Sequence, residues 1–344
     1  MGTFAAKAAI GLLHATRTHR LFASRQAGTG AILAFHRVLP RTHRSFAPNA
    51  ALEVTPEFFC SVIEFLRHRD YEIVSLAEAA RRLRSGDAAR RFCCLTFDDG
   101  YRDNRFHVLP LARRYRAPIA VFVTTGFLTG AGIVWWLALE HLVRTQAAVE
   151  FTGPDGTHRL PARDEAEKEI AYRTIASVLA KSAPAEVAAL FAQWRERYGT
   201  DFAGEAARDM LTWADLEELL ASGLVEIGAH TVHHACLSRL DPAEARAEML
   251  DSQRTIEARL RRPAPFFAYP YGRPEHAGAR EYALAAELGF ALALTMRHGP
   301  VRDAHRATPH ALPRITMNAS YASLAALEVF LSGAVAALLP ETAR

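Results

Sequence analysis

The stretch Cys93-Cys94-Leu95-Thr96-Phe97-Asp98-Asp99-Gly100-Tyr101 places two adjacent carboxylates directly after a run of uncharged residues with strand character. The pattern predicts a buried strand that ends at Phe97 and presents Asp98 and Asp99 at its carboxyl end. Two neighbouring ionised carboxylates repel each other, and a cation or a proton relieves that repulsion. The stretch therefore indicates either a metal site, with one aspartate as ligand and the other free as a base, or an ordinary Asp-Asp-Gly turn.

Apolar runs typical of strands alternate with helical patterns on both sides of this stretch. Helix-capping signals open several of the helices, among them Thr55-Pro56 and Asp241-Pro242. The alternation predicts a parallel β/α architecture, and the polar landmarks follow the strands, at the edge where the active sites of β/α barrels lie. Besides the strand at 93–97, strands are predicted at 31–35, 72–76, 119–124, 225–229, 265–269, 290–295 and 312–316.

Three segments stand outside this alternation. Residues 1–30 form a basic N-terminal extension, and residues 321–344 are predicted to form a C-terminal helix because most of them are apolar. Between about 127 and 211 the strand pattern disappears and helical patterns dominate, which predicts a helical insertion on a barrel loop. The barrel itself is assigned to residues 31–320, and the insertion is expected to influence substrate choice because loops at that edge shape the pocket.

The composition sets limits on the class of protein. The 344 residues carry a net charge of +4 and are 50% hydrophobic, so the chain can bury a large core. Basic residues are scattered without interleaved aromatics, which argues against nucleic-acid binding. The apolar run at residues 8–13 is too short to span a membrane and lacks a cleavage pattern, so no signal peptide is predicted. Reduced thiols are expected at Cys60, Cys93, Cys94 and Cys236, which lack zinc-type or disulfide-type spacing.

A second motif follows the predicted strand at 225–229, in the sequence Gly228-Ala229-His230-Thr231-Val232-His233-His234. One helical turn after the strand would place His230 and His234 on the same face. Two histidines and a carboxylate are a plausible set of three ligands for zinc or a similar ion. A histidine pair at this spacing also occurs without a metal, and His233 is expected to have a structural role.

Together, the two motifs make the sequence resemble the polysaccharide deacetylase family, carbohydrate esterase family 4, also called the NodB homology domain. The family's first motif reads Thr-Phe-Asp-Asp-Gly, as residues 96–100 do, and its second reads His-(Ser/Thr)-x-x-His, as residues 230–234 do. The resemblance covers about residues 31–317 without the insertion. It implies a distorted (β/α) barrel of seven or eight parallel strands and metal-dependent removal of N- or O-acetyl groups from sugars.

The resemblance also implies roles for individual residues. By position, Asp98 is the catalytic base, and the metal ligands are Asp99, His230 and His234. The implied cofactor is a divalent metal, with Zn²⁺ as first choice and Co²⁺, Ni²⁺ or Mn²⁺ as alternatives. A metal acidifies its bound water and a neighbouring carboxylate accepts the proton, which suits these assignments. The implied partner is an N-acetylated glycan or glycoconjugate.

Two further family motifs are altered in this chain. Ala268-Tyr269-Pro270-Tyr271-Gly272 resembles the family's third motif, so Tyr271 is the position whose N–H stabilises the oxyanion, but the motif's arginine is missing. Arg314 is a candidate to replace that arginine, and an ordinary surface arginine is the alternative. The family's general-acid histidine has a poor match at His298. Circularly permuted relatives carry it after the first strand, where this chain has His36, so His36 is the first candidate.

Other readings stay open at this level. A C–N hydrolase acting on a non-sugar amide or imide uses the same barrel, and a catalytically silent carbohydrate-binding barrel would also fit the altered motifs. Trp135 and Trp136 are expected in the core, with a saccharide groove as the alternative. The basic N-terminus and apolar C-terminus would permit peripheral contact with the inner membrane, and a cytoplasmic location is the other expectation. The sequence leaves the oligomeric state undetermined.

Overall fold

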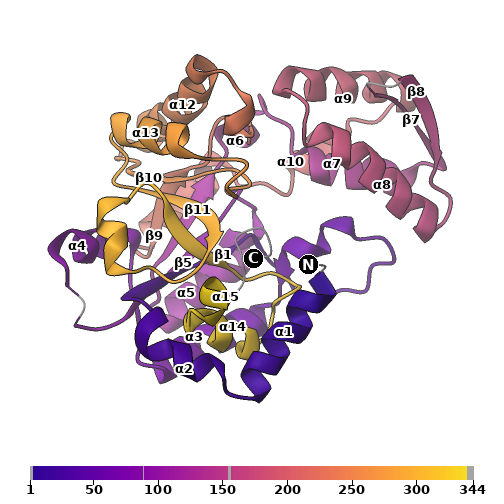
Figure 1. Cartoon of the computed structure of the whole chain (residues 1–344). Coiled ribbons are helices and arrows are strands. Elements are labelled where there is room, and N and C mark those ends of the chain that lie inside the picture. The colour runs from indigo at the N-terminus through magenta and orange to yellow at the C-terminus, as the bar shows by residue number, and fades with distance from the viewer. Residues whose placement is uncertain (1–2, 88, 154–155, 339–344) are drawn as a thin grey trace.

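The computed structural model of the chain describes residues 3–87, 89–153 and 156–338. A closed barrel of seven parallel strands lies at its centre and is surrounded by helices (Figure 1), which confirms the predicted fold class. Strand β1 pairs with both β12 and β5, and this double pairing closes the ring. The barrel strands are β1 (Gly30–Phe35), β5 (Phe92–Phe97), β6 (Ile119–Val123), β9 (Val225–Ala229), β10 (Phe266–Ala268), β11 (Leu292–His298) and β12 (Leu312–Thr316).

The strand predicted at 72–76 lies outside this ring. Strand β4 (Glu72–Ile73) pairs in parallel with the first residues of β5 and closes no gap between barrel strands. Two small sheets lie outside the barrel: β2 (Arg37–Val38) pairs with β3 (Glu53–Val54), and β7 pairs with β8 in the insertion. Short 3₁₀ or π turns occupy η1 (Pro48–Leu52), η2 (Asn104–Val108), η3 (Leu237–Arg239) and η4 (Asp303–Ala307).

The barrel strands are buried on both faces, as their uncharged sequences require. Every residue of β1, β5 and β6 is buried, as expected for parallel strands covered by side chains on both sides. Cys93 packs in the layer between strands and outer helices, whereas Cys94 packs with interior residues of the barrel. The two neighbouring thiols therefore point to opposite faces as predicted, and all four cysteines are free.

The outer helices begin where the capping signals predicted. The Thr55 side chain accepts a hydrogen bond from Phe58 N, and Asp241 accepts from Ala243 N and Glu244 N. Helix α4 differs from the others because its apolar residues pack with the barrel interior, so it covers the amino end of the barrel. The helices around the barrel are α3 (Pro56–His68), α4 (Leu76–Ser85), α5 (Leu109–Tyr115), α11 (Trp213–Ala221), α12 (Pro242–Leu260) and α13 (Ala279–Glu287).

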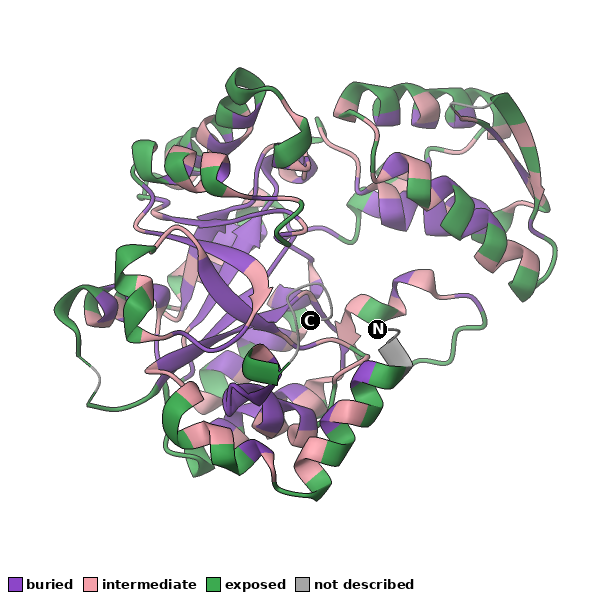
Figure 2. Ribbon diagram, viewed as in Figure 1, coloured by how far each residue is buried: buried purple, intermediate pink, exposed green. Residues whose placement is uncertain are grey.

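The residues between β6 and β9 form a separate lobe with its own hydrophobic core (Figures 1 and 2). The prediction of a helical insertion missed the antiparallel hairpin of β7 (Ala148–Gly153) and β8 (Gly156–Pro161). These strands are short, and most of their residues are partly or fully exposed, so they lack a continuous apolar run. The helices of the lobe are α6 (Thr125–Thr129), α7 (Trp135–Thr145), α8 (Glu165–Leu179), α9 (Pro184–Tyr198) and α10 (Phe202–Ala207).

Helices from the two ends of the chain pack together beside the barrel. The basic N-terminal extension contains α1 (Thr3–Ala15) and α2 (His19–Gln26). Helix α1 contacts α14 (Leu324–Leu331), and α2 contacts α15 (Ala334–Leu338). The prediction of one C-terminal helix is wrong, because Gly333 adopts a φ of 75° and separates α14 from α15; residues 339–344 lie outside the described part. Within the described residues, no helix combines the length and apolarity that a membrane crossing requires.

Candidate active site

The predicted site residues gather at the carboxyl ends of the barrel strands. His36 follows β1, Asp98 and Asp99 follow β5, and His230 follows β9. The order of the strands in the barrel places these strand ends next to one another, because β5 pairs with β1 and β6, and β6 pairs with β9. Residues far apart in sequence therefore face one common centre.

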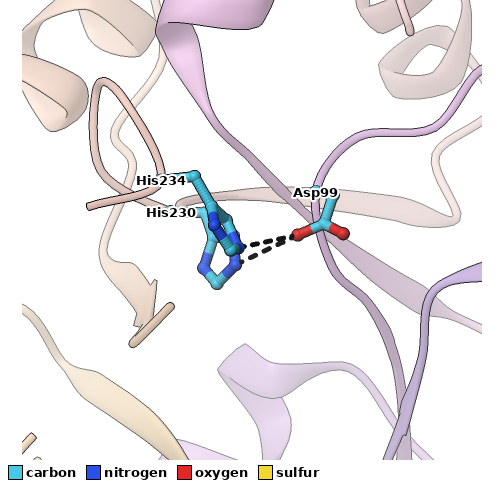
Figure 3. A group of neighbouring side chains, drawn as sticks. All are labelled: Asp99, His230 and His234. Atoms are coloured by element: carbon cyan, nitrogen blue, oxygen red, sulfur yellow. Dashed lines mark ion pairs between the residues drawn. The ribbon is translucent and has the colours of Figure 1, made fainter. Parts of the chain in front are cut away.

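Asp99, His230 and His234 form one compact cluster (Figure 3). The Nε2 atoms of His230 and His234 lie 3.3 and 3.2 Å from Asp99 Oδ1. One ligand atom from each residue lies within 4.8 Å of the other two. Asp99 and His230 are buried, and the His234 side chain is 9% exposed. The three side chains predicted as ligands are thus brought together by the fold.

The loop that carries both histidines is irregular, so the predicted helical turn is wrong. Thr231 and His234 adopt left-handed φ angles of 63° and 57°. These angles reverse the chain twice within a few residues, and the reversal brings both imidazoles to one carboxylate. Glu248 on α12 fixes the loop, because its carboxylate accepts hydrogen bonds from the backbone N–H groups of Val232 and His233 at 2.9 Å.

His233 points away from the cluster, as expected for a structural residue. Its Nδ1 atom lies 2.6 Å from Glu248 Oε1. The hydrogen bond that His233 donates to Glu248 is the main reason that the pKa of His233 is raised above its ordinary value. The carboxylate that holds the backbone of this loop therefore also binds the side chain of His233.

The cluster has the features of a metal site. Asp99 Oδ1 is buried and has no hydrogen-bond partner among the described residues, which is unusual for a carboxylate oxygen. His230 Nδ1 lies 2.7 Å from the carbonyl oxygen of Ala268. A carbonyl only accepts, so Nδ1 carries the proton and Nε2 keeps a lone pair directed at Asp99, the tautomer that metal-binding histidines use.

The electrostatics of the cluster keep Asp99 anionic. Burial alone would raise the pKa of Asp99, but the neighbouring imidazoles of His230 and His234 hold it well below its ordinary value. Burial lowers the pKa of His234, which favours the neutral imidazole. An anionic carboxylate with two neutral imidazoles suits Zn²⁺ or a similar divalent ion.

Asp98 forms a buried, two-pronged ion pair with Arg314. Arg314 Nη1 and Nη2 each donate a 2.7 Å hydrogen bond to one oxygen of Asp98. Arg314 is 0% exposed, which excludes the alternative of a surface arginine. Burial would raise the pKa of Asp98, but Arg314 and, to a smaller extent, the neighbouring imidazoles outweigh burial, and the pKa of Asp98 is lowered. Each oxygen retains a second lone pair, so the carboxylate can still accept a proton.

The two candidates for the general acid lie in different surroundings. His36 is partly buried, and its Nδ1 atom is buried without a hydrogen-bond partner among the described residues. His36 is close enough to Asp98 and Asp99 for its charge to lower the pKa of both carboxyls. His298 instead packs against the ring of Phe330, with 4.4 Å between centroids. The arrangement favours His36 on proximity, although its role stays a prediction.

Tyr271 forms part of a cavity beside the cluster. It adopts a left-handed φ of 59°, and its ring centroid lies 4.9 Å from that of His234. Burial raises the pKa of Tyr271 to about 12, so the phenol is neutral. A cavity of about 250 Å³ opens here and is also lined by Trp135 and Arg239. Arg239 Nη1 donates to Ala180 O at 2.8 Å, which ties this barrel loop to the insertion.

Sequence reasoning missed a second layer of residues behind Asp99. Trp136 Nε1 donates a 2.7 Å hydrogen bond to the hydroxyl of Tyr101. Burial and the charge of Asp99 raise the pKa of Tyr101 well above its ordinary value, so the hydroxyl is neutral. Tyr101 directly follows Asp-Asp-Gly, and its place in that stretch was the available signal. The partner Trp136 comes from the insertion and carried no such signal.

Residues 161–293 match the sequence model of a family described as polysaccharide deacetylase. Over this segment, the chain is similar to the polysaccharide deacetylase family. The match contains His230 and His234, whereas Asp98 and Asp99 precede it and reach the histidines through the barrel. The match supports an enzyme of the polysaccharide deacetylase class. No curated protein matches the sequence.

Solved structures of deacetylases have the same fold. The Streptococcus pyogenes deacetylase PplD, solved with acetate, is 20% identical with a TM-score of 0.58, covering 87% of this chain and 97% of that one. IcaB from Ammonifex degensii is 17% identical with a TM-score of 0.55, covering 89% and 98%. A de-N-acetylase from Aggregatibacter actinomycetemcomitans is 14% identical with a TM-score of 0.55, covering 88% and 99%. At these identities, the likeness establishes the shared fold.

Proposed function

We propose that this chain is a divalent-metal-dependent deacetylase that removes N-acetyl groups from an extended glycan. The observation that carries the proposal is the meeting of Asp99, His230 and His234 beside the Arg314-paired Asp98. Three potential ligands leave coordination positions open for water and substrate, which is typical of catalytic metal sites. The family match and the fold shared with de-N-acetylases support the same reaction class.

In the proposed mechanism, Asp98 is the base. When bound, a divalent metal at Asp99, His230 and His234 would supply a lowered pKa for water and polarisation of the acetyl carbonyl. Asp98 accepts the proton of the attacking water through a lone pair that Arg314 leaves free. Arg314 fixes the orientation of the carboxylate and keeps it ionised before the proton is transferred.

The other end of the reaction needs a proton donor and an oxyanion partner. The C–N bond breaks when the leaving nitrogen receives a proton, and acetate and a free amine result. His36 is the proposed donor, because it follows β1 at the same end of the barrel as both carboxylates and its buried Nδ1 has no hydrogen-bond partner among the described residues. The backbone N–H of Tyr271 is the proposed partner for the carbonyl oxygen, since Tyr271 lines the cavity beside His234.

The substrate binds in the cavity between the barrel and the insertion. Its volume of about 250 Å³ lies near the lower limit of ligand pockets, so it accepts a group of sugar size rather than a polymer chain. Trp135 is partly exposed at its wall and offers a flat apolar face for a sugar ring. Trp135→Ala should raise KM for oligosaccharides several-fold with little change in kcat. The contact with the sugar ring is the same in the ground state and in the transition state, so its loss weakens binding without slowing the chemical step.

Acetate release is the direct test of the proposed function. The purified chain is incubated with N-acetylglucosamine oligomers and lipid-linked N-acetylated sugars, before and after treatment with a chelator, and again with added Zn²⁺. We expect release that the chelator abolishes and the metal restores. Asp98→Asn should bind metal without turnover, and His233→Gln is the matched control that leaves the ligands intact.

Other outcomes would identify the alternatives. Turnover that survives complete removal of metal would contradict metal dependence. Release from small amides or imides, with none from any N-acetylated glycan, would indicate a C–N hydrolase of the other class. Glycan binding that is equal in the wild type and in Asp98→Asn, without turnover in either, would indicate a silent binding barrel.

A further inference from the structure

Helix α1 is apolar on both of its faces, although only one of them is covered by the protein. Ala6 and Ile10 are buried on the side where α1 packs on α14. Ala5, Ala8, Leu12 and Ala15 recur at helical spacing on the other side, and all are exposed. A helix that is hydrophobic all round is normally buried on all sides. The exposed stripe on α1 therefore lacks a partner within the described chain.

Large exposed apolar side chains recur in the helices next to this stripe. Leu12 on α1 is 64% exposed, Leu21 on α2 is 78% exposed, and Leu338 on α15 is 50% exposed. The turn of residues 16–18 joins α1 to α2, and α15 contacts α2. The three leucines thus belong to one group of terminal helices, at the bottom of Figure 1 and away from the lobe of α8 and α9.

The charge of the chain is concentrated in the same helices. Residues 1–30 contain four basic side chains and no acidic one, so their net charge equals the +4 of the whole protein, and the remaining residues are balanced. The basic side chains are Lys7, Arg17, Arg20 and Arg25. The first acidic residue of the sequence is Glu53. Exposed leucines on helices with an excess of basic side chains are typical of helices that lie on an anionic bilayer.

A basic cavity continues this charged surface. Arg20 lines a surface cavity of about 500 Å³ together with Arg69 and Arg91. Glu328 also lines this cavity. Its Oε1 atom lies 2.5 Å from Nη2 of Arg69 and 3.8 Å from Nη2 of Arg20. Arg20 and Arg69 are 55% and 42% exposed, so both guanidinium groups remain accessible to phosphate oxygens.

We infer that α1 and α2 form a docking surface for a lipid bilayer that contains anionic phospholipids. Leu12 and Leu21 enter the boundary between headgroups and acyl chains, while Lys7, Arg17, Arg20 and Arg25 contact lipid phosphates. The charge complementarity selects a bilayer over an apolar protein partner, because a second copy of the chain would bring the same positive charges together. This surface is separate from the proposed catalytic site, so its test does not depend on turnover.

Flotation of the full chain with vesicles tests the inference. Vesicles of phosphatidylcholine with about 30% phosphatidylglycerol should carry the protein, and vesicles of phosphatidylcholine alone should carry about tenfold less. Leu12→Asp/Leu21→Asp should reduce binding about tenfold or more. The control Ile170→Asp changes a side chain on α8 that is about as exposed as Leu12 (63% against 64%), and this variant should bind like the wild type.

The electrostatic part has its own pair of variants. Lys7→Gln/Arg17→Gln/Arg25→Gln should lower binding to the anionic vesicles and weaken its dependence on salt. The matched control Lys168→Gln/Arg173→Gln/Arg208→Gln removes the same charge from the insertion and should leave binding unchanged. All variants should keep a melting temperature close to that of the wild type, because the substituted side chains are exposed, except for Lys168, which is partly exposed.

Three results would overturn the inference. Wild-type protein that stays unbound with anionic vesicles at low salt would exclude a bilayer surface. Equal loss of binding in Leu12→Asp/Leu21→Asp and in Ile170→Asp would show that the terminal helices have no special part. A dimer in sedimentation that Leu12→Asp converts to a monomer, without vesicle binding, would make the stripe a contact between two copies.

Discussion

Arg314 on β12 donates to both carboxylate oxygens of Asp98, which follows β5, through two hydrogen bonds of 2.7 Å inside the barrel. The same guanidinium donates from Nε to the carbonyl oxygen of Thr295 at 2.9 Å, so its orientation is fixed from a third side. The pair spans 216 positions of sequence, and we propose that Arg314 takes the role of the arginine that the Ala268–Gly272 motif lacks.

Removal of Arg314 should damage both stability and activity. Arg314→Met leaves the Asp98 carboxylate buried without a partner, and loss of one member of a buried ion pair costs about 3–5 kcal/mol. Acetate release should fall about 100-fold or more, because the base loses its orientation. Urea unfolding and initial rates measure the two effects.

A double-mutant cycle supplies the control for this pair. In an Asp98→Asn background, Arg314→Met should cost clearly less unfolding free energy than in the wild type, since no buried anion remains. Additive losses in the two backgrounds would show that the two side chains do not interact energetically.

Metal removal should lower the melting temperature of the protein. A ligand that binds only the folded state stabilises it by mass action, so saturating Zn²⁺ should raise the melting temperature of the chelated protein on the order of 10 °C. Asp98→Asn should respond like the wild type, whereas His234→Ala should respond weakly or not at all. Identical melting curves with and without metal would contradict the assignment of Asp99, His230 and His234 as ligands.

Tyr101 should set the metal affinity without contacting the reacting groups. Tyr101→Phe removes the hydroxyl that accepts from Trp136 and whose pKa is raised by the charge of Asp99. Loss of such an outer partner typically weakens metal binding 10–100-fold. Metal titration by calorimetry measures this directly, and Trp136→Phe should have a smaller effect because the Tyr101 hydroxyl stays in place. An unchanged metal affinity in Tyr101→Phe would show that Tyr101 does not support the metal site.

Glu226 should make the stability of the barrel depend on pH. Its carboxylate accepts from the backbone N–H groups of Leu76 and Ala77 at 2.6 and 3.0 Å, at the start of α4. Burial raises the pKa of Glu226 above its ordinary value of 4.5, and these hydrogen bonds offset only part of the rise. A raised carboxyl pKa means that the stabilising contribution is complete below the unfolded pKa and is lost as pH rises through the folded pKa.

The matched variant for this prediction is Glu226→Gln, which cannot ionise. Relative to Glu226→Gln, the wild type should lose unfolding free energy as the pH is raised from 4 toward neutrality, as measured by urea unfolding at each pH. A difference between the two proteins that stays constant over this range, or that grows with pH, would contradict the raised pKa.

Local patterns in the sequence determined the elements of this protein. The uncharged run Cys93–Phe97 became the fully buried β5, and the caps at Thr55 and Asp241 begin α3 and α12 as predicted. These features depend on side-chain periodicity and on hydrogen bonds between near neighbours, which the sequence displays directly. The insertion hairpin was missed because short, half-exposed strands lack such a signal.

The candidate site was predictable only in part. Asp98, Asp99, His230 and His234 stand in two motifs, so their proximity could be expected from the family resemblance. The helical turn expected at His230–His234 is absent, because left-handed residues and the contacts of Glu248 shape that loop. Backbone angles of this kind at threonine and histidine leave no pattern in the sequence.

The sequence by itself determined which strand ends carry carboxylates and imidazoles, because that depends on neighbours along the chain. Only the tertiary structure decided that Arg314 pairs with Asp98, that Trp136 donates to Tyr101, and that His36 follows β1 at the same end of the barrel as both carboxylates. The physical reason is barrel closure. Strand β1 enters the ring between β12 and β5, and this placement depends on the packing of the whole chain rather than on any single segment.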